Sequence, residues 1–381
     1  MRDTPERSRF REEVARFAAA EVAPNLREWD ESDAYPQHLF PRLGALGWLG
    51  VGIPEEVGGS GGGPLDRCAL FEELAAVSPG VALGIYVHAV LASGALATVA
   101  SPDLRQRFLP GLLAGEVTGA WAYAEPEAGA DVTRVRLAAR RHGSGFVLEG
   151  TKLYITNGTF ADLILVVART SGEPGSLRGL TVFAVDGESP GLSRRPMAKL
   201  GMHPSELAEL HFDGVEVAAD RVLGDDEGGF RACLPVLSQG RIFGGVMAVG
   251  LGRGALGAAV AHVAAREQFG GPLHRQQVVR FTIADMAARL AAARALVYGA
   301  AADLEAGRPY DTAASVAKLA ASETATWMAE RAMHLHGAAG YVAGSPVQRF
   351  YRDCKIIEYG EGANEVQREM IFEAAAKGWR P

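Results

Sequence analysis

A single carboxylate stands between two glycines near the C-terminus, in Tyr359-Gly360-Glu361-Gly362-Ala363. Glycine lets the backbone approach a ligand closely and leaves room beside the acid. A carboxylate in a tight, poorly hydrated place has a raised pKa and can act as a general base toward a carbon acid. Alone, the Gly-Glu-Gly motif is also typical of a turn at a helix end, and short motifs match by chance often. Segments elsewhere in the chain must decide between the two interpretations.

Further polar and aromatic segments occur upstream of this motif. They are WAYAEPEAGAD at 121–131, GTKLYITNG at 150–158, KLGMHPS at 199–205, ELHFDGV at 209–215, and REQFG at 266–270 followed by Gln276 and Gln277. Each alone indicates only a turn, a hairpin or a helix end. Their order and spacing together are hard to obtain by chance.

Three parts of the chain would position these segments. Residues 1–118 are predicted to be helical, because Phe10, Val14 and Phe17 recur at helical spacing. Residues 119–229 contain short β-prone runs at 134–141, 146–155, 163–168, 180–185 and 207–212, separated by turn signals. Residues 230–381 are rich in alanine, and apolar residues from 279 to 297 alternate steps of four and three, as in a helix bundle. The predicted fold class is therefore multidomain α+β.

Composition excludes several classes of function. The 38 basic and 45 acidic residues give a net charge of −7, and without a basic run the chain is a poor nucleic-acid binder. The chain has three distant cysteines and no CxxC pair, which argues against a disulfide framework and a zinc site. A chain without disulfides fits the reducing cytoplasm. The charged N-terminus is unlike a signal peptide. Residues 81–100 lack charge over a membrane-spanning length, but their Ala, Gly, Ser and Thr content favours a buried helix and no membrane association.

Taken together, the segments resemble the acyl-CoA dehydrogenase family over nearly the whole chain. The family pattern is Thr-Glu-Pro-x-Ala-Gly-Ser-Asp near the first segment, Gly-x-Lys-x-Trp-Ile-Thr-Asn near the second and Glu-Gly-Thr near the last. The resemblance implies an N-terminal helical domain, a central β domain of barrel or sandwich type and a C-terminal four-helix bundle. It also implies FAD between the β domain and the bundle, and a homotetramer or homodimer whose partner subunit completes the FAD site.

The same resemblance implies roles for individual positions. The residues expected to line the flavin ring are Trp121, Tyr123, Ala124, Tyr154 and Thr156. Those expected to hold the diphosphate and adenine across the subunit boundary are Arg266, Phe269, Gln277, His334, Gly337 and Ala338. Ala363 and Glu365 are expected on the flavin side of the base, and Ala130, Arg241 and Gly362 on the substrate side. No metal ligands are expected.

Glu361 falls where many family members carry the catalytic base. The implied reaction removes the α-proton and a β-hydride from an acyl thioester, giving a trans-2-enoyl product. A base in a dry site makes the weakly acidic α-proton easier to remove. The thioester oxygen needs fixed donors, which the resemblance identifies as the Glu361 backbone N–H and a flavin hydroxyl. Some members instead place the base one residue before an arginine; here that arginine corresponds to Arg241, and Gly240 cannot be a base.

Several positions depart from the family pattern. Ala124 and Ala363 stand where hydroxyl side chains are usual, and each missing partner is worth about 1 kcal/mol. Tyr154 replaces a tryptophan but still stacks, and Ala130 replaces a serine. His334 and Ala338 replace a glutamine and a glycine of the nucleotide loop. These changes leave open whether coenzyme A or an acyl carrier protein presents the acyl group in fatty acid metabolism.

Other classes of function compete with this interpretation. GRGALG at 252–257 satisfies the dinucleotide pattern G-x-G-x-x-G, but no strand precedes it and no βαβ alternation surrounds it, which argues against an NAD enzyme. Glu361 argues against a flavin monooxygenase, and the length of 381 residues argues against a dedicated acyl-CoA oxidase. A flavin-free scaffold of the same fold is the non-enzymatic alternative. The predicted electron acceptor is an electron-transferring flavoprotein.

Overall fold

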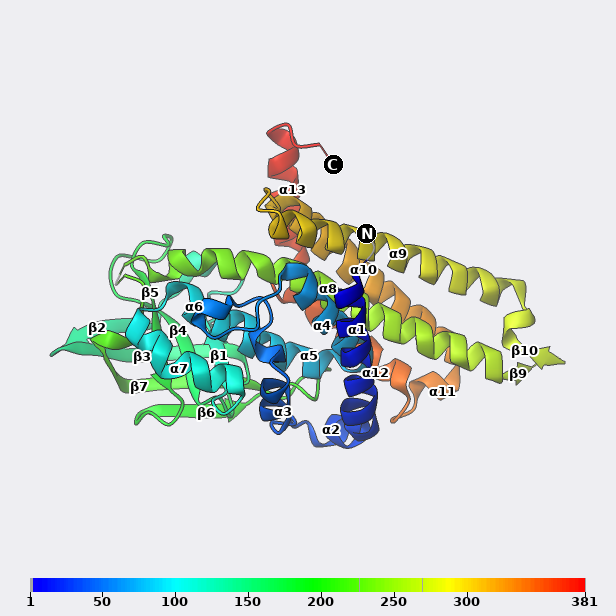
Figure 1. Cartoon of the computed structure of the whole chain (residues 1–381), viewed down its shortest axis with the longest axis horizontal. Coiled ribbons are helices and arrows are strands. Elements are labelled where there is room, and N and C mark those ends of the chain that lie inside the picture. The colour runs from blue at the N-terminus through cyan, green and yellow to red at the C-terminus, as the bar shows by residue number, and fades with distance from the viewer. Residues whose placement is uncertain (1–2, 226, 269, 381) are drawn as a thin grey trace.

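The computed structural model describes residues 3–225, 227–268 and 270–380. Figure 1 shows an elongated molecule with a β-sheet at one end of its long axis and a helical bundle reaching to the other. The N-terminal helices lie along the side of both parts.

Helices form the first part of the chain. They are α1 (Pro5–Phe17), η1 (Ala18–Val22), η2 (Ala23–Asn25), α2 (Leu26–Ser32), α3 (Leu39–Ala45), η3 (Trp48–Gly50), η4 (Glu55–Val57), α4 (Pro64–Val77), α5 (Pro79–Tyr86), η5 (Val87–Ala92), α6 (Ser93–Val99) and α7 (Pro102–Ala114). Local chemistry explains their starts. Thr4 accepts the backbone N–H of Arg7 ahead of α1, and Ser78 accepts that of Val81 ahead of α5, each with proline at the first helical position.

The middle part is a twisted, largely antiparallel sheet. Its strands are β1 (Gly119–Ala122), β2 (Ala138–His142), β3 (Gly145–Thr156), β4 (Leu163–Arg169), β5 (Leu180–Asp186), β6 (Leu192–Pro196), β7 (Leu207–Ala218) and β8 (Val222–Leu223), with short 3-10 turns η6 (Val132–Arg134) and η7 (Ala219–Arg221). The strand order is β6-β7-β3-β2-β4-β5-β8, and β1 pairs in parallel with β4. The described strands form an open path with two ends. The sheet is therefore not a closed barrel, and the barrel alternative of the predicted β domain is wrong.

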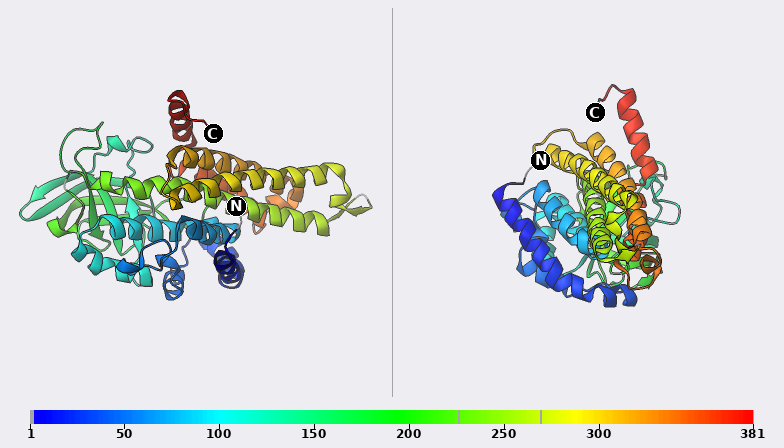
Figure 2. Two further views of the ribbon diagram at one scale, coloured as in Figure 1. Left: turned by 45° about the horizontal axis from the view of Figure 1, so that its top comes forward. Right: turned by 90° about the vertical axis from the view of Figure 1, so that its right-hand side faces the viewer.

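The last part is a bundle of long helices. Its elements are α8 (Gly229–Ala265), β9 (Glu267–Gln268), β10 (Gly271–Pro272), η8 (Leu273–Arg275), α9 (Gln277–Glu305), α10 (Asp311–His336), α11 (Ala338–Tyr341), α12 (Pro346–Tyr359) and α13 (Asn364–Ala376). Helix α10 packs against α8, α9, α12 and α13. Figure 2 shows α13 projecting away from the other helices at its C-terminal end. The predicted seam falls on α9, where Met286, Ala293 and Val297 are buried.

Two hydrophobic cores organise the molecule. One is continuous through the N-terminal helices and the bundle, and the other lies within the sheet. The first contains a buried charge cluster that joins α4 to the bundle: Glu72 accepts hydrogen bonds from Arg11, Arg253 and Arg294 at 3.1–3.3 Å. The boundaries predicted near residues 118 and 229 stay a prediction, because the helical parts share this core.

The glycine pattern at 252–257 lies inside α8, so it opens no helix after a strand. There the small residues allow close helix packing: a Cβ on Gly254 would lie 2.3 Å from the carbonyl oxygen of Ala76. Two helical stretches, Pro79–Val99 and Gly229–Ala265, are long and apolar enough to cross a membrane by length and composition alone. In the first, 94% of the apolar window is buried inside the protein, as in a core helix.

A candidate active site between the sheet and the bundle

A cavity of about 510 Å³ lies where α5 and η5, the sheet and the end of α12 meet. Segments distant in sequence build its wall. The predicted site residues that line it are Trp121, Tyr123, Ala124, Ala130, Tyr154, Thr156, Glu361, Gly362 and Ala363. The structure therefore brings together the candidate base and the residues expected around a flavin ring.

A β-bulge aims Tyr154 into this cavity. The register between β3 and β7 shifts between Lys152 and Ile155, and Tyr154 has a φ of 62°. Bulges of this kind turn a side chain away from the regular alternation of a strand. Tyr154 keeps 60% of its surface exposed, which is unusual for a large aromatic side chain within a strand. The bulge thus presents an aromatic face to whatever the cavity holds.

A buried ion pair fixes the segment that carries Tyr123 and Ala124. The Lys152 ammonium donates to the Tyr123 carbonyl at 2.9 Å and to the Glu125 carboxylate at 2.7 Å. Glu125 also accepts the backbone N–H groups of Arg136 and Leu137. Burial lowers the pKa of Lys152 to about 8, and Glu125 opposes this shift. The lysine and glutamate of the two sequence motifs therefore hold the wall of the cavity in place.

Glu361 lies in the turn between α12 and α13 and has a left-handed backbone, with φ 55° followed by φ 86° at Gly362. Its carboxylate turns inward against α8. A Cβ built on Gly240 would lie 1.8 Å from Glu361 Oε2 and 2.7 Å from the Tyr86 hydroxyl. With Glu361 in this position no side chain fits at position 240, because the carboxylate occupies its space. The Glu361 backbone N–H makes no hydrogen bond to another described residue.

The environment of Glu361 suits a general base. Burial raises the pKa of its carboxyl from 4.5 to about 7, while Tyr86 and Lys318 act in the opposite direction. Tyr86 is fully buried, and its hydroxyl faces the Glu361 carboxylate beside Gly240. The pKa of Tyr86 is raised, first by burial and then by the nearby Glu361. A carboxyl with a pKa near 7 can hold or release a proton at neutral pH.

The sequence interpretation missed part of this wall. Leu83, Val87 and Leu91 line the cavity from α5 and η5. Their i, i+4, i+8 spacing could have marked one face of the uncharged 81–100 segment. Tyr86 and Lys318 were also missed, because no local pattern distinguishes a buried polar side chain from an exposed one.

The remaining predicted site residues lie away from the cavity. Arg241 is buried on α8 but pairs with Asp311 at 2.6 Å, and the Glu365 side chain is 79% exposed on α13. At the far tip of the bundle, around the β9–β10 hairpin of Figure 1, lie Arg266, Gln277, His334, Gly337 and Ala338, all exposed. Phe269 lies outside the described residues. Within one chain these tip residues do not reach the cavity.

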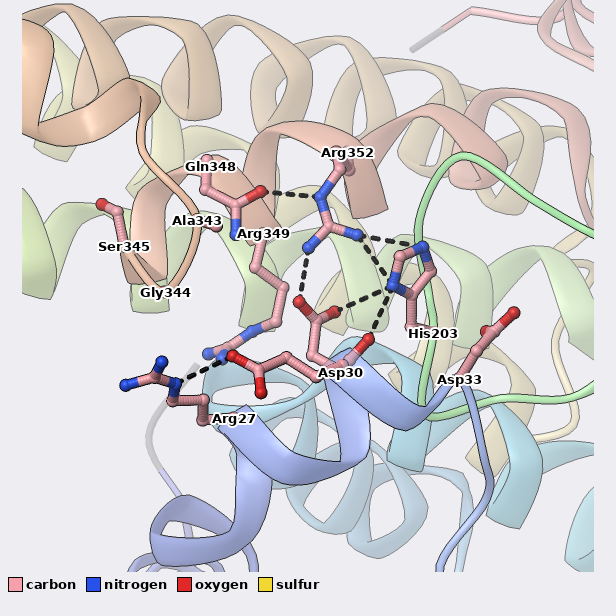
Figure 3. A pocket seen from close by; sticks show the side chains of 11 residues that line it. Arg27, Asp30, Asp33, His203, Ala343, Gly344, Ser345, Gln348, Arg349 and Arg352 are labelled. Atoms are coloured by element: carbon pink, nitrogen blue, oxygen red, sulfur yellow. Dashed lines mark hydrogen bonds and ion pairs between the residues drawn. The ribbon is translucent and has the colours of Figure 1, made fainter.

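A second, charged cavity of about 390 Å³ lies between α2 and α12 (Figure 3). Arg352 pairs with Asp30 at 2.6 Å and donates to His203. The next residue, Asp353, accepts the backbone N–H of Met202. Burial raises the pKa of Asp353 to about 6. This cluster ties the loop at 199–205, which borders the 510 Å³ cavity, to the helix that leads to Glu361.

Comparisons with known proteins agree with this geometry. Models of the N-terminal, middle and C-terminal domains of acyl-CoA dehydrogenases match residues 4–116, 120–215 and 227–376. A probable acyl-CoA dehydrogenase of Bacillus subtilis, YngJ, is 34% identical over 375 residues, covering 98% of this chain and 99% of the relative. The structure of butyryl-CoA dehydrogenase from Megasphaera elsdenii superposes with a TM-score of 0.94 at 33% identity, covering 99% of both chains.

A chain from a structure described as an electron-transferring flavoprotein of Acidaminococcus fermentans superposes with a TM-score of 0.95 at 33% identity, covering 98% of this chain and 99% of that one. The three domain models match in order and over most of the sequence, which establishes the family. This chain belongs to the acyl-CoA dehydrogenase family of oxidoreductases.

Proposed function

We propose that the protein catalyses the FAD-dependent α,β-dehydrogenation of an acyl thioester, with Glu361 as the base that accepts the α-proton. The observation that carries the proposal is the position of Glu361. Its carboxyl, with a pKa raised to about 7, lies in the wall of a cavity lined by aromatic and aliphatic side chains.

The residues of the cavity fit a flavin ring. Trp121, Tyr123 and Tyr154 supply flat aromatic surfaces, and Thr156 supplies a hydroxyl. The indole N–H of Trp121 is buried without a partner among the described residues, so it is free to donate to a heteroatom of the ring. When bound, the flavin would supply the acceptor for the β-hydride.

The chain's own residues account for the rest of the chemistry. The Glu361 carboxylate is placed to take a proton from Cα. The unengaged N–H of Glu361 is placed to donate to the thioester oxygen, where negative charge develops. Leu83, Val87 and Leu91 form an apolar wall suited to an acyl chain and exclude water from it.

The partners follow from the same proposal. The tip residues Arg266, Gln277 and His334 would hold the FAD diphosphate and adenine of a neighbouring subunit in a homodimer or homotetramer, where a guanidinium suits phosphate oxygens. An electron-transferring flavoprotein would reoxidise the cofactor; the likeness to the Acidaminococcus fermentans chain supports this choice. Three buried free cysteines support a cytoplasmic location.

An anaerobic titration tests the proposal. The purified holoenzyme is mixed with short, medium and branched acyl-CoA esters while the flavin absorbance is followed. We expect one class to bleach the flavin, and we expect Glu361→Gln to keep the colour but to lose reduction by orders of magnitude. Near-normal reduction in Glu361→Gln would remove Glu361 from the mechanism.

The alternative is a substrate carried on an acyl carrier protein, motivated by the alanines at positions 124, 130 and 363. A yellow protein that no acyl-CoA bleaches but an acyl carrier protein thioester does would establish it. A colourless protein that FAD cannot reconstitute would favour the scaffold interpretation.

A further inference from the structure

Lys318 is a fully buried lysine on α10, beneath the turn that carries Glu361. Its ammonium donates three hydrogen bonds: to the Glu358 carbonyl at 3.1 Å, to the Gly362 carbonyl at 2.8 Å and to the Asn364 side-chain oxygen at 2.8 Å. These acceptors come from the end of α12, from the turn and from the start of α13. One cation thus joins all three parts of the segment around the base.

Resting on the function proposed above, we infer that Lys318 is the positioning residue for Glu361: it holds the left-handed turn in place and provides a positive charge that favours the ionised form of the base. It acts through the Glu361 turn and does not border the cavity.

The backbone of the turn shows why it needs an anchor. Glu361, a residue with a Cβ, has φ 55°, a left-handed conformation that is unfavourable for any residue other than glycine. It persists only where the surroundings impose it. Lys318 holds this conformation through its hydrogen bonds from α10, and the Gln367 side chain donates a further hydrogen bond to the same Gly362 carbonyl at 3.0 Å.

The buried charge of Lys318 is stabilised by neutral acceptors rather than by a paired carboxylate. All three acceptors are neutral, and the ammonium forms no ion pair with a described carboxylate. Burial lowers the pKa of Lys318 to about 8, and Glu361 is the largest of the acidic groups that oppose this shift. Both side chains lie beside Gly244 of α8: a Cβ on Gly244 would lie 3.5 Å from Glu361 Cβ and 3.9 Å from Lys318 Cγ.

Other charged groups around the base have defined partners or lie farther out. Tyr86 on α5 and Tyr123 after β1 face Glu361, and burial raises the pKa of both, so they remain neutral. Glu358 on α12 pairs with Lys355, and the carboxylate of Glu365 on α13 is exposed.

The buried arginines near the base bind other groups. On α8, Arg241 pairs with Asp311, and on α4, Arg67 donates a hydrogen bond to the Val51 carbonyl. Among the described residues, Lys318 is therefore the cation that acts on Glu361.

The test measures the pKa of Glu361 in the holoenzyme by infrared difference titration, with Glu361→Gln identifying its carboxyl band. We expect the midpoint to rise by about one pH unit in Lys318→Met and Lys318→Gln, because an opposite charge is lost. The acid limb of the flavin-reduction rate should move with it, giving about a tenfold lower rate well below the midpoint.

Two controls separate charge from structure. Lys318→Arg keeps the charge and should keep the midpoint. Ser322→Ala removes a hydrogen bond of 3.1 Å to the same Asn364 oxygen without changing charge, and should also leave the midpoint in place. An unchanged midpoint in a folded Lys318→Met or Lys318→Gln variant would overturn the inference. So would the failure of both neutral variants to fold, since the role would then be structural alone.

The infrared readout needs no turnover. If no acyl thioester bleaches the wild-type flavin, the proposed dehydrogenation fails, whereas the infrared titration still decides whether Lys318 sets the ionisation of Glu361.

Discussion

Replacing Glu361 with glutamine should make the protein more stable at alkaline pH, although it removes the proposed base. In the folded protein the carboxyl has a pKa of about 7, against 4.5 for an unperturbed glutamate. Between these values the folded state keeps a proton that the unfolded state has lost, so the free energy of unfolding falls as the pH rises from 4.5 through 7. The pKa difference corresponds to about 3 kcal/mol above pH 7, and partial exposure of the residue reduces this to about 2–3 kcal/mol.

Glu361→Gln removes this cost, because a neutral amide has no charge to bury. We expect the melting temperature of the FAD-saturated variant to exceed that of the wild type by about 2–4 °C at pH 8, and the two to agree near pH 4.5. Differential scanning calorimetry at a fixed scan rate measures both. Glu369→Gln, at an exposed carboxylate on the neighbouring α13, is the matched control and should show no such pH-dependent gain. A gain of equal size at both pH values, or a loss at pH 8, would refute the reasoning.

Three further substitutions test separate parts of the structure. Gly240→Ala should displace the Glu361 carboxylate and lower anaerobic flavin reduction by at least about 100-fold, whereas Gly257→Ala, on the open side of the same helix, should not; equal rates in the two variants would contradict the packing described above. Glu72→Gln leaves three arginines without their shared buried carboxylate and should cost about 3 kcal/mol of unfolding free energy in urea titrations; a cost below about 1 kcal/mol would mean that the cluster is solvated. Tyr86→Phe removes the hydroxyl that faces the Glu361 carboxylate and opposes the rise in its pKa, so the pKa of Glu361 should rise further in the infrared titration; an unchanged pKa would show that the hydroxyl does not stabilise the carboxylate.

Periodicity predicted the larger elements of this fold. The apolar steps along α9 and the β-prone runs that became β3, β4 and β5 appear in the structure at nearly their predicted bounds. Local sequence patterns did not predict the elements whose formation depends on tertiary contacts. The short strands β1, β6 and β8 were not predicted, because runs of two to five residues show no pattern of their own and each is held by its neighbours in the sheet.

The family motifs brought most of the cavity wall together but gave no reason for each residue. Lys152 and Glu125 were part of recognised segments, yet only the structure shows that they form the buried pair that fixes Tyr123. Similarly, Tyr154 was read as a stacking residue, whereas the bulge that turns it into the cavity cannot be read from a run that alternates like any other strand. Chemistry-bearing residue types are visible in a sequence; the backbone conformation that aims them is not.

Gly240 and Glu361 show the limit most clearly. They are 121 positions apart, and each has an ordinary explanation alone: a glycine in a long helix and an acid in a turn. In the structure the carboxylate of one fills the place where the side chain of the other would be. A side chain at position 240 and the inward carboxylate of Glu361 therefore compete for the same space. The absence of a side chain at position 240 is thus part of how Glu361 is placed, and it becomes visible only when α8 and the α12–α13 turn are seen in contact.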